Sequence, residues 1–168
     1  LQSAVGSAYF SMMMQPYGTV SSPPVILQNG TAGSSVIYTN STSAKVNVAA
    51  PELLEQNYDF VLRVNNTVTD SWDIRLKKYA DSNIDRLQNC TIYFHNSTDG
   101  TSSQIYIQNG SYINQTGPWY ALETSETIYI AMTVYANSTE TSYVYSYLEI
   151  CIPGTTTYAQ YIITFEIT

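Results

Sequence analysis

Asparagines followed two positions later by serine or threonine recur throughout this chain of 168 residues. Such an Asn-X-Ser/Thr sequon is the acceptor for an N-linked glycan, and an occupied sequon must lie at the surface of a secreted protein. Eight of the twelve asparagines have this spacing: Asn29, Asn40, Asn65, Asn89, Asn96, Asn109, Asn114 and Asn137. This density predicts an extracellular protein whose outer surface is covered by carbohydrate.

Most of these sequons fall in segments typical of turns between apolar runs. Glycine directly follows Asn29 and Asn109, and residues 96–100, 114–118 and 137–140 are rich in turn-forming types. We therefore expect the glycans to sit on loops. Asn89 differs from the others because a cysteine lies inside its sequon, so disulfide formation would compete with glycosylation there.

Cys90 and Cys151 are the two cysteines, and each lies in a strand-like run. In a secreted protein an even number of cysteines indicates a disulfide. A Cys90–Cys151 bridge would stabilise the fold by roughly 4 kcal/mol through the entropy of the unfolded chain. Two buried free thiols are the alternative. One histidine and two distant cysteines do not form a metal-ligand set, so we expect no metal and no cofactor apart from covalent N-glycans.

Residue types that could support catalysis are sparse. His95 is the only histidine and directly precedes the sequon of Asn96. The Gly-X-Ser-X-Gly motif of a nucleophilic serine is missing. Nothing in the spacing of the carboxylates singles out a pair for glycoside hydrolysis; the candidates are Glu52, Glu55, Asp70, Asp73, Asp81 and Asp85. Residues 81–85 resemble the start of a calcium loop but lack its glycine and its final glutamate. We expect no enzymatic activity.

Other side chains have structural explanations. Trp72, Trp119 and the 16 tyrosines could form a sugar-binding platform, but their positions in alternating strands favour core packing or a tyrosine ladder. An isopeptide bond would require Lys45 or Lys77 to be buried. Charged residues make up 11% of the chain and the net charge is −7. This balance, without a basic stripe, argues against a nucleic-acid partner.

Alternation of apolar and polar residues dominates the chain and predicts strands. Short intervals rich in turn residues separate these runs, which fits an immunoglobulin-like or pilin-like β-sandwich and leaves no room for βαβ units. We expect a helical turn only near residues 81–87 or 51–56. The predicted strands are 25–28, 35–39, 45–50, 58–64, 72–79, 91–95, 104–108, 119–123, 127–136, 142–152 and 158–167.

Residues 1–22 differ from the sandwich body predicted for 23–168, because they contain neither a charge nor a sequon. Pro23-Pro24 follows as a stiff hinge. An uncharged apolar strand at a terminus promotes aggregation unless something covers it. The segment could form the first strand of its own sandwich, or it could complete a groove of the next subunit by strand addition. One face of the segment is continuously apolar: Ala4, Gly6, Ala8, Phe10, Met12 and Met14.

The chain begins at Leu1 without a charged leader, and we expect it to be the mature form of a secreted protein after signal-peptide removal. No stretch approaches the roughly 20 apolar residues that a membrane span requires, so we expect no stable membrane insertion. Strand donation is a head-to-tail contact, which propagates into a filament instead of closing as a dimer.

The uncharged N-terminal strand, the Ser/Thr/Tyr-rich all-β body, the dense sequons and the cysteine pair together resemble the subunit of archaeal thread pili. That resemblance implies a β-sandwich pilin that is heavily N-glycosylated and polymerises with identical subunits by donor-strand complementation. It implies a cell-surface filament that supports adhesion or cell–cell contact. Two other functions remain open: a monomeric secreted carbohydrate-binding or adhesin domain, and a surface-layer or virion coat protein.

Overall fold

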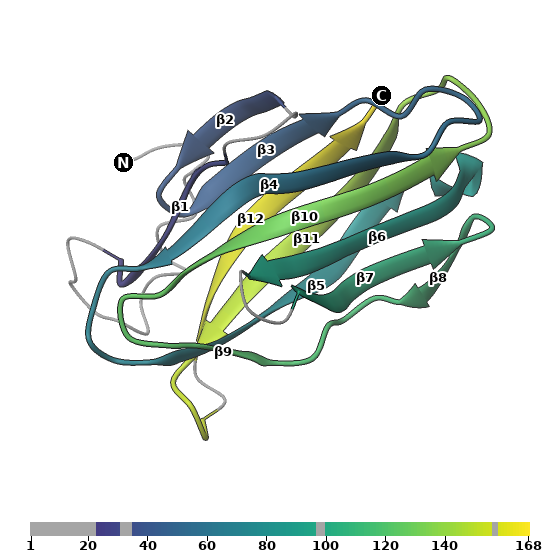
Figure 1. Cartoon of the computed structure of the whole chain (residues 1–168). Helices are drawn as coiled ribbons and strands as arrows, with labels where there is room; N and C mark the ends of the chain where they lie inside the picture. The colour runs from purple at the N-terminus through teal and green to yellow at the C-terminus, as the bar shows by residue number, and fades with distance from the viewer. Residues whose placement is uncertain (1–22, 31–34, 97–99, 156–157) are drawn as a thin grey trace.

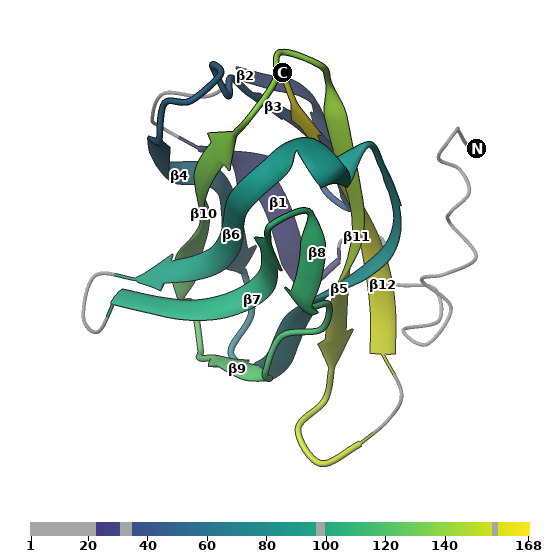
Figure 2. The same ribbon diagram turned by 90° about the vertical axis from the view of Figure 1, so that its right-hand side faces the viewer.

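Two sheets packed face to face make up the described part of the chain (Figures 1 and 2). The computed structural model describes residues 23–30, 35–96, 100–155 and 158–168. Within these residues each sheet has six strands, in the orders β1-β4-β10-β6-β7-β8 and β2-β3-β12-β11-β5-β9. This confirms the predicted all-β sandwich. The N-terminal segment 1–22 lies outside the described residues, so its boundary with the body stays a prediction.

The first sheet contains β1 (Val25–Asn29), β4 (Gln56–Asn66), β10 (Thr127–Ala136), β6 (Leu87–Asn96), β7 (Gly100–Gln108) and β8 (Ser111–Asn114). The second sheet contains β2 (Ser35–Asn40), β3 (Ser43–Val48), β12 (Tyr158–Ile167), β11 (Ser142–Cys151), β5 (Trp72–Ser82) and β9 (Tyr120–Leu122). Neighbouring strands pair antiparallel, except that β3 and β12 are parallel.

Alternation in the sequence places the core between the sheets. In β11 the side chains of Val144, Ser146 and Leu148 are buried, and the tyrosines between them point to the outer face. The inner face of β12 contributes Tyr161, whose hydroxyl donates a 2.5 Å hydrogen bond to the carbonyl of Val25 in the opposite sheet. This bond ties β12 to the edge strand β1.

The 3-10 turn Ile84–Arg86 falls in one of the two segments where a helical turn is expected. The other segment, 51–56, contains no helix. The short strand β8 was not predicted, because four residues after an Asn-Gly turn give too little alternation to recognise.

Arg86 is a charged residue but is only 4% exposed, and its hydrogen bonds hold one end of the sandwich together. Its guanidinium donates two hydrogen bonds to the carbonyl of Ser138, at 3.2 and 2.8 Å. Further bonds reach the Ser142 hydroxyl and the Ile167 carbonyl, both at 3.1 Å, and the Ala50 carbonyl at 3.3 Å. Burial lowers the pKa of Arg86. One side chain therefore joins both sheets and the loop between β10 and β11.

Gln104 has a similar role near the edge of the second sheet. It is fully buried, and its carboxamide oxygen accepts a 2.8 Å hydrogen bond from the backbone N–H of Leu76. Its amide group donates to the Pro118 carbonyl at 3.0 Å. Gly117 provides the necessary space, because a Cβ there would lie 1.9 Å from the Gln104 carboxamide oxygen.

Candidate functional site: glycan acceptors and sheet edges

The sequons are distributed unevenly over the two sheets. Six lie in strands of the first sheet or in the β7–β8 turn, and Asn137 directly follows β10 of the same sheet. Asn40, the last residue of β2, is the one sequon in the second sheet. The other strands of the second sheet, β3, β5, β9, β11 and β12, contain none.

Four acceptor side chains are exposed at strand ends or turns, as a loop location predicts: Asn29, Asn40, Asn109 and Asn137. The Asn109-Gly110 turn joins β7 to β8 with φ angles of 50° and 73°. This left-handed conformation is the one that a two-residue Asn-Gly hairpin turn requires. At Asn40 the carboxamide oxygen accepts a 2.9 Å hydrogen bond from the backbone N–H of Thr42, the hydroxyl residue of the same sequon. These four acceptors are open to a glycan.

Three further acceptors are half-buried, and the side chains of two of them form hydrogen bonds within the chain. Asn65 lies within β4, and its carboxamide oxygen accepts a 2.9 Å hydrogen bond from Thr127. The amide group of Asn114 donates to the Gln104 carbonyl at 3.1 Å. Asn89 lies within β6, and its buried carboxamide oxygen has no hydrogen-bond partner in the described part of the chain. The loop location predicted for the sequons therefore does not extend to Asn65 and Asn89, which are in strands.

Asn96 is the last residue of β6, and residues 97 and 98 of its sequon lie outside the described residues. The proposed donor residues Ala4, Gly6, Ala8, Phe10, Met12 and Met14 lie outside them as well. Their role stays a prediction.

The predicted Cys90–Cys151 disulfide is wrong, because both thiols are free and buried. Strands β6 and β11 both run away from the end of the sandwich where Arg86 contacts Ser142. Cys90 is four residues beyond Arg86, whereas Cys151 is nine residues beyond Ser142. At about 3.3 Å per residue, the difference of five residues is roughly 16 Å along the strands. A disulfide requires Cα atoms within about 7 Å of each other.

Four open edges remain in the described sheets, at β1, β8, β2 and β9. They contain five, four, six and three residues respectively. The C-terminal strand β12 is paired on both sides from Ile162 to Ile167, by β11 and β3, whereas the register with β3 does not reach residues 158–161. The edge strands, and such unpaired stretches of longer strands, are where a strand from another subunit could add to this body.

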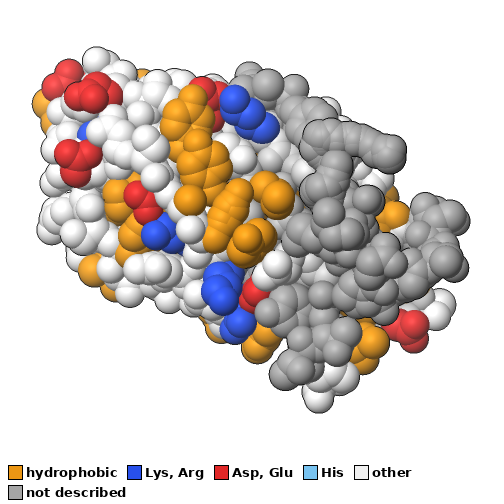
Figure 3. Space-filling view, turned by 180° about the vertical axis from the view of Figure 1, so that it is seen from behind, with side chains coloured by type: hydrophobic (Ala, Val, Ile, Leu, Met, Phe, Trp, Pro, Cys, Tyr) orange, Lys and Arg blue, Asp and Glu red, His pale blue; other side chains and the backbone are white. Residues whose placement is uncertain are grey.

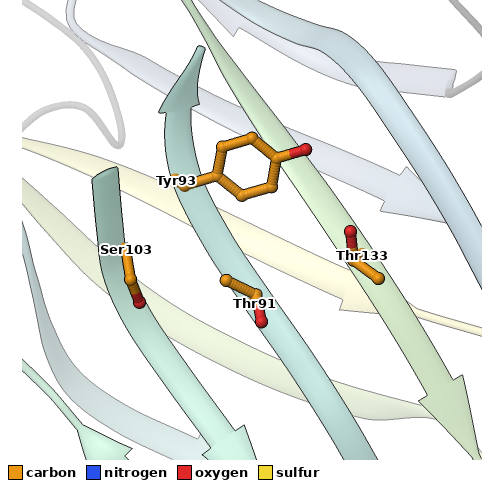
Figure 4. Close-up of a pocket in the computed structure, with 4 residues that line it drawn as sticks. All are labelled: Thr91, Tyr93, Ser103 and Thr133. Carbon is orange, nitrogen blue, oxygen red and sulfur yellow. The ribbon is translucent and has the colours of Figure 1, made fainter. Parts of the chain in front are cut away.

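A shallow depression of about 280 Å³ lies on the outer face of the first sheet (Figure 4). Thr91 and Tyr93 from β6, Ser103 from β7 and Thr133 from β10 line it. Their hydroxyl groups can donate and accept hydrogen bonds, and none of the four carries a charge. This lining suits a polar, uncharged ligand group.

His95 lies in an aromatic cluster on the same face. Its ring is 5.2 Å from that of Phe60 and 6.4 Å from that of Tyr93, both edge to face. The Nδ1 atom of His95 is buried and has no hydrogen-bond partner among the described residues. A catalytic triad would place a carboxylate at this nitrogen to orient the ring.

The described residues contain no cluster of three side chains that could hold a metal ion, and one of the candidate carboxylates, Asp81, forms a 2.9 Å ion pair with Lys78. Neither candidate lysine for an isopeptide bond is buried: Lys77 is exposed, and the Lys45 side chain is 39% exposed and 3.6 Å from Glu166. Trp72 is buried in the core, as expected.

Trp119 is 41% exposed, contrary to the core position that its alternation favours. The Arg75 guanidinium lies 4.0 Å from the centre of its ring. Arg75 also donates a 2.8 Å hydrogen bond to Glu149, a fully buried carboxylate that the sequence did not single out. The described residues contain no helix long and apolar enough to cross a bilayer.

No model of a known protein family matches the sequence, and no curated protein matches it. Several solved structures are distantly similar. The CooA pilin subunit of enterotoxigenic Escherichia coli is 13% identical, with a TM-score of 0.47, over 87% of this chain and 98% of that one. The N-terminal domain of PorA is 15% identical, with a TM-score of 0.46, over 86% and 97%. PapD-like domain 7 of human CEP192 is 10% identical, with a TM-score of 0.44, over 89% and 91%. Similarity this distant carries no conclusion about function, and the sandwich is assigned from its own strand pairing.

Proposed function

We propose that this chain is the structural subunit of an extracellular, N-glycosylated filament, assembled head to tail when residues 1–22 of one copy add to a sheet edge of the next. The observation that carries the proposal is the extent of the body: the described residues between 25 and 167 form two six-stranded sheets around a continuous buried core. We expect this body to fold without residues 1–22, so that a subunit can donate its N-terminal segment without emptying its own sandwich.

The composition of residues 1–22 supports donation. An uncharged strand with one apolar face satisfies the two requirements of strand addition, which are a free backbone and side chains that fill alternate pockets. The body offers edges that are short, and short edges limit nonspecific sheet extension while leaving a few backbone groups for a specific partner.

The sequons support an extracellular location and a coated surface. Acceptors at Asn29, Asn40, Asn109 and Asn137 are exposed, and residues 1–28 contain no sequon. A bare donor segment avoids the steric block that a glycan would impose on strand insertion. The filament would then act mechanically, in adhesion or cell–cell contact.

Deletion of residues 1–22 tests the proposal. The truncated protein should fold, remain monomeric in sedimentation velocity and form no filaments in electron micrographs. A matched pair of single changes refines the test: Phe10→Asp places a carboxylate on the apolar face, at a cost of several kcal/mol in a pocket, whereas Ser11→Asp places it on the opposite face. Normal filaments from the truncated chain would refute donation by this segment.

The second candidate is a monomeric secreted carbohydrate-binding or adhesin domain, which the exposed aromatic side chains of the second sheet favour. The full-length glycoprotein would then elute as a monomer. A surface-layer or virion coat protein would instead form two-dimensional or closed assemblies in electron micrographs.

A further inference from the structure

Four tyrosines form a continuous strip on the outer face of the second sheet. Tyr143, Tyr145 and Tyr147 are successive outward residues of β11. Tyr79 of β5 joins them at a bulge, because Tyr145 pairs with Ala80 and the next residue of β11 pairs with Lys78. We call these four residues the tyrosine strip.

The rings of the tyrosine strip are in mutual contact. Tyr143 and Tyr145 are nearly parallel, with centroids 5.8 Å apart and planes at 7°. Tyr79 and Tyr145 are also nearly parallel, at 6.2 Å and 11°. Tyr79 meets Tyr147 edge to face at 4.3 Å. These contacts hold each ring in place, so that a ligand would pay little entropy to order them.

Most charged groups beside the strip are paired within the chain; Lys77, which lies opposite Tyr147 in the sheet register, is exposed and has no ion-pair partner among the described residues. At one end the Tyr143 hydroxyl donates a 2.8 Å hydrogen bond to Glu166, which also lies 3.6 Å from Lys45. At the other end Glu149 accepts hydrogen bonds from Arg75 at 2.8 Å and from Gln160 at 3.0 Å. Figure 3 shows hydrophobic side chains in a column on this face, with Lys/Arg and Asp/Glu side chains near both ends. The strip between these pairs is neutral.

We propose that the tyrosine strip binds a neutral polysaccharide chain. Aromatic side chains are apolar on the ring faces and polar at the hydroxyl, and a pyranose has the complementary arrangement of an apolar C–H face and a rim of hydroxyls. Because the charges at both ends of the strip are paired internally and only Lys77 beside Tyr147 has no such pair among the described residues, an uncharged partner is favoured. Strands β3, β5, β11 and β12 contain no sequon, so within the second sheet a glycan of the chain's own would be attached at Asn40 on the edge strand β2.

The available area argues for a sugar and against a second copy of the chain. Tyr79 is 38% exposed and the other three tyrosines are less so. A whole aromatic side chain spans roughly 150–250 Å², so the four together present at most about 400 Å². A standard protein interface buries about 800 Å² on each partner. A short run of sugar units fits the smaller area.

Calorimetric titration of the full-length glycoprotein tests this inference, which does not depend on filament formation. The probes are maltohexaose, laminarihexaose and mannohexaose, with hexagalacturonate as the charged control. We expect at least one neutral hexasaccharide to bind, with an affinity that changes by less than about twofold between low and high salt. The double variant Tyr145→Thr/Tyr147→Thr retains strand propensity and should weaken binding by about tenfold or more.

The matched control is Tyr135→Thr, at an outward position of β10 in the first sheet, which should bind as the wild type does. Circular dichroism checks that each variant is folded, and electron microscopy scores filaments separately. Absence of binding by all three neutral probes, unchanged affinity in the double variant, or a preference for hexagalacturonate would each overturn the inference. Loss of self-association in the double variant, without sugar binding by the wild type, would assign the face to a second copy instead.

Discussion

Replacing Arg86 by methionine should destabilise the sandwich more than any change in surface charge. The guanidinium donates to the carbonyls of Ser138, Ile167 and Ala50 and to the Ser142 hydroxyl. Methionine fills a similar volume without donors. It therefore removes the hydrogen bonds and leaves the cavity largely filled.

The expected loss of stability can be estimated from the buried carbonyl groups that would lose their hydrogen-bond donor. Ile167 and Ala50 are buried, so their carbonyls lose their Arg86 donor without a replacement from solvent. An unsatisfied buried acceptor costs about 1–3 kcal/mol. Two such groups give about 2–6 kcal/mol, and relief from burying the cation offsets part of this. We expect a net loss of about 3 kcal/mol, which lowers the Tm by roughly 6–12 °C in a chain of this size.

Urea unfolding followed by circular dichroism measures the loss, provided that the slope of the free energy with urea is unchanged. Arg63→Met is the matched control, because Arg63 is half-buried on an outer face and its Nε has no hydrogen-bond partner among the described residues. The control should change stability by less than about 0.5 kcal/mol. An Arg86→Met effect no larger than that of the control would show that the guanidinium does not hold this end together.

Three further predictions concern other buried groups. Gly117→Ala should displace the Gln104 carboxamide and lower stability by about 1–3 kcal/mol in urea unfolding, and a neutral result would show that Gln104 is free to move. Cys90 and Cys151 should each take up iodoacetamide in denaturant without reductant, whereas native Cys90 should resist because burial raises its pKa to about 12; an unlabelled pair would indicate a disulfide. Burial tends to raise the pKa of Glu149, but hydrogen bonds from arginine and glutamine partners outweigh it and lower the pKa. Its stabilisation is therefore present above the usual carboxyl pKa and lost as pH falls through the lowered value. Glu149→Gln should thus destabilise at pH 7 and have little effect near pH 2, and an equal loss at both pH values would contradict this.

Local patterning predicted most of the strands because each alternates between an apolar core and a polar exterior. In β11 the sequence Tyr-Val-Tyr-Ser-Tyr-Leu marks the inner and outer faces directly, and the Asn109-Gly110 turn specifies its hairpin. The sequence could not predict whether the two cysteines form a disulfide. Each lies in a strand as expected, but their separation depends on how far along β6 and β11 they lie from a shared end, which only the sheet registers determine.

The buried charges and the tyrosine strip depend on tertiary contacts in the same way. Arg86 and Glu149 resemble ordinary surface residues in the sequence, and they become buried only because distant carbonyls or an arginine from β5 surround them. Tyr79 reaches the strip through a bulge, where one extra residue shifts the side-chain alternation. No signal in the sequence marks that residue as the extra one.

The titration of the groups around the tyrosine strip makes its proposed ligand binding testable by pH. Burial, followed by repulsion from Tyr147, raises the pKa of Tyr79. The hydrogen bond to Glu166, followed by burial, raises the pKa of Tyr143. That same bond is the main cause that lowers the pKa of Glu166. Both tyrosines therefore stay neutral past the usual phenol range, and Glu166 stays ionised below the usual carboxyl range.

Neutral hexasaccharide affinity should consequently be constant between about pH 5 and about pH 9, because no group that contacts the strip changes charge in that interval. As pH falls through the lowered pKa values of Glu149 and Glu166, their protonation would release Arg75 and Lys45 from their ion pairs and make both ends of the strip positive. A sulfated oligosaccharide, which keeps its charge in acid, should bind there although it does not bind at neutral pH. Titrations at three pH values measure both effects. A neutral-sugar affinity that varied steadily from pH 5 to pH 9 would place a titrating group in the binding site and contradict recognition by the tyrosines.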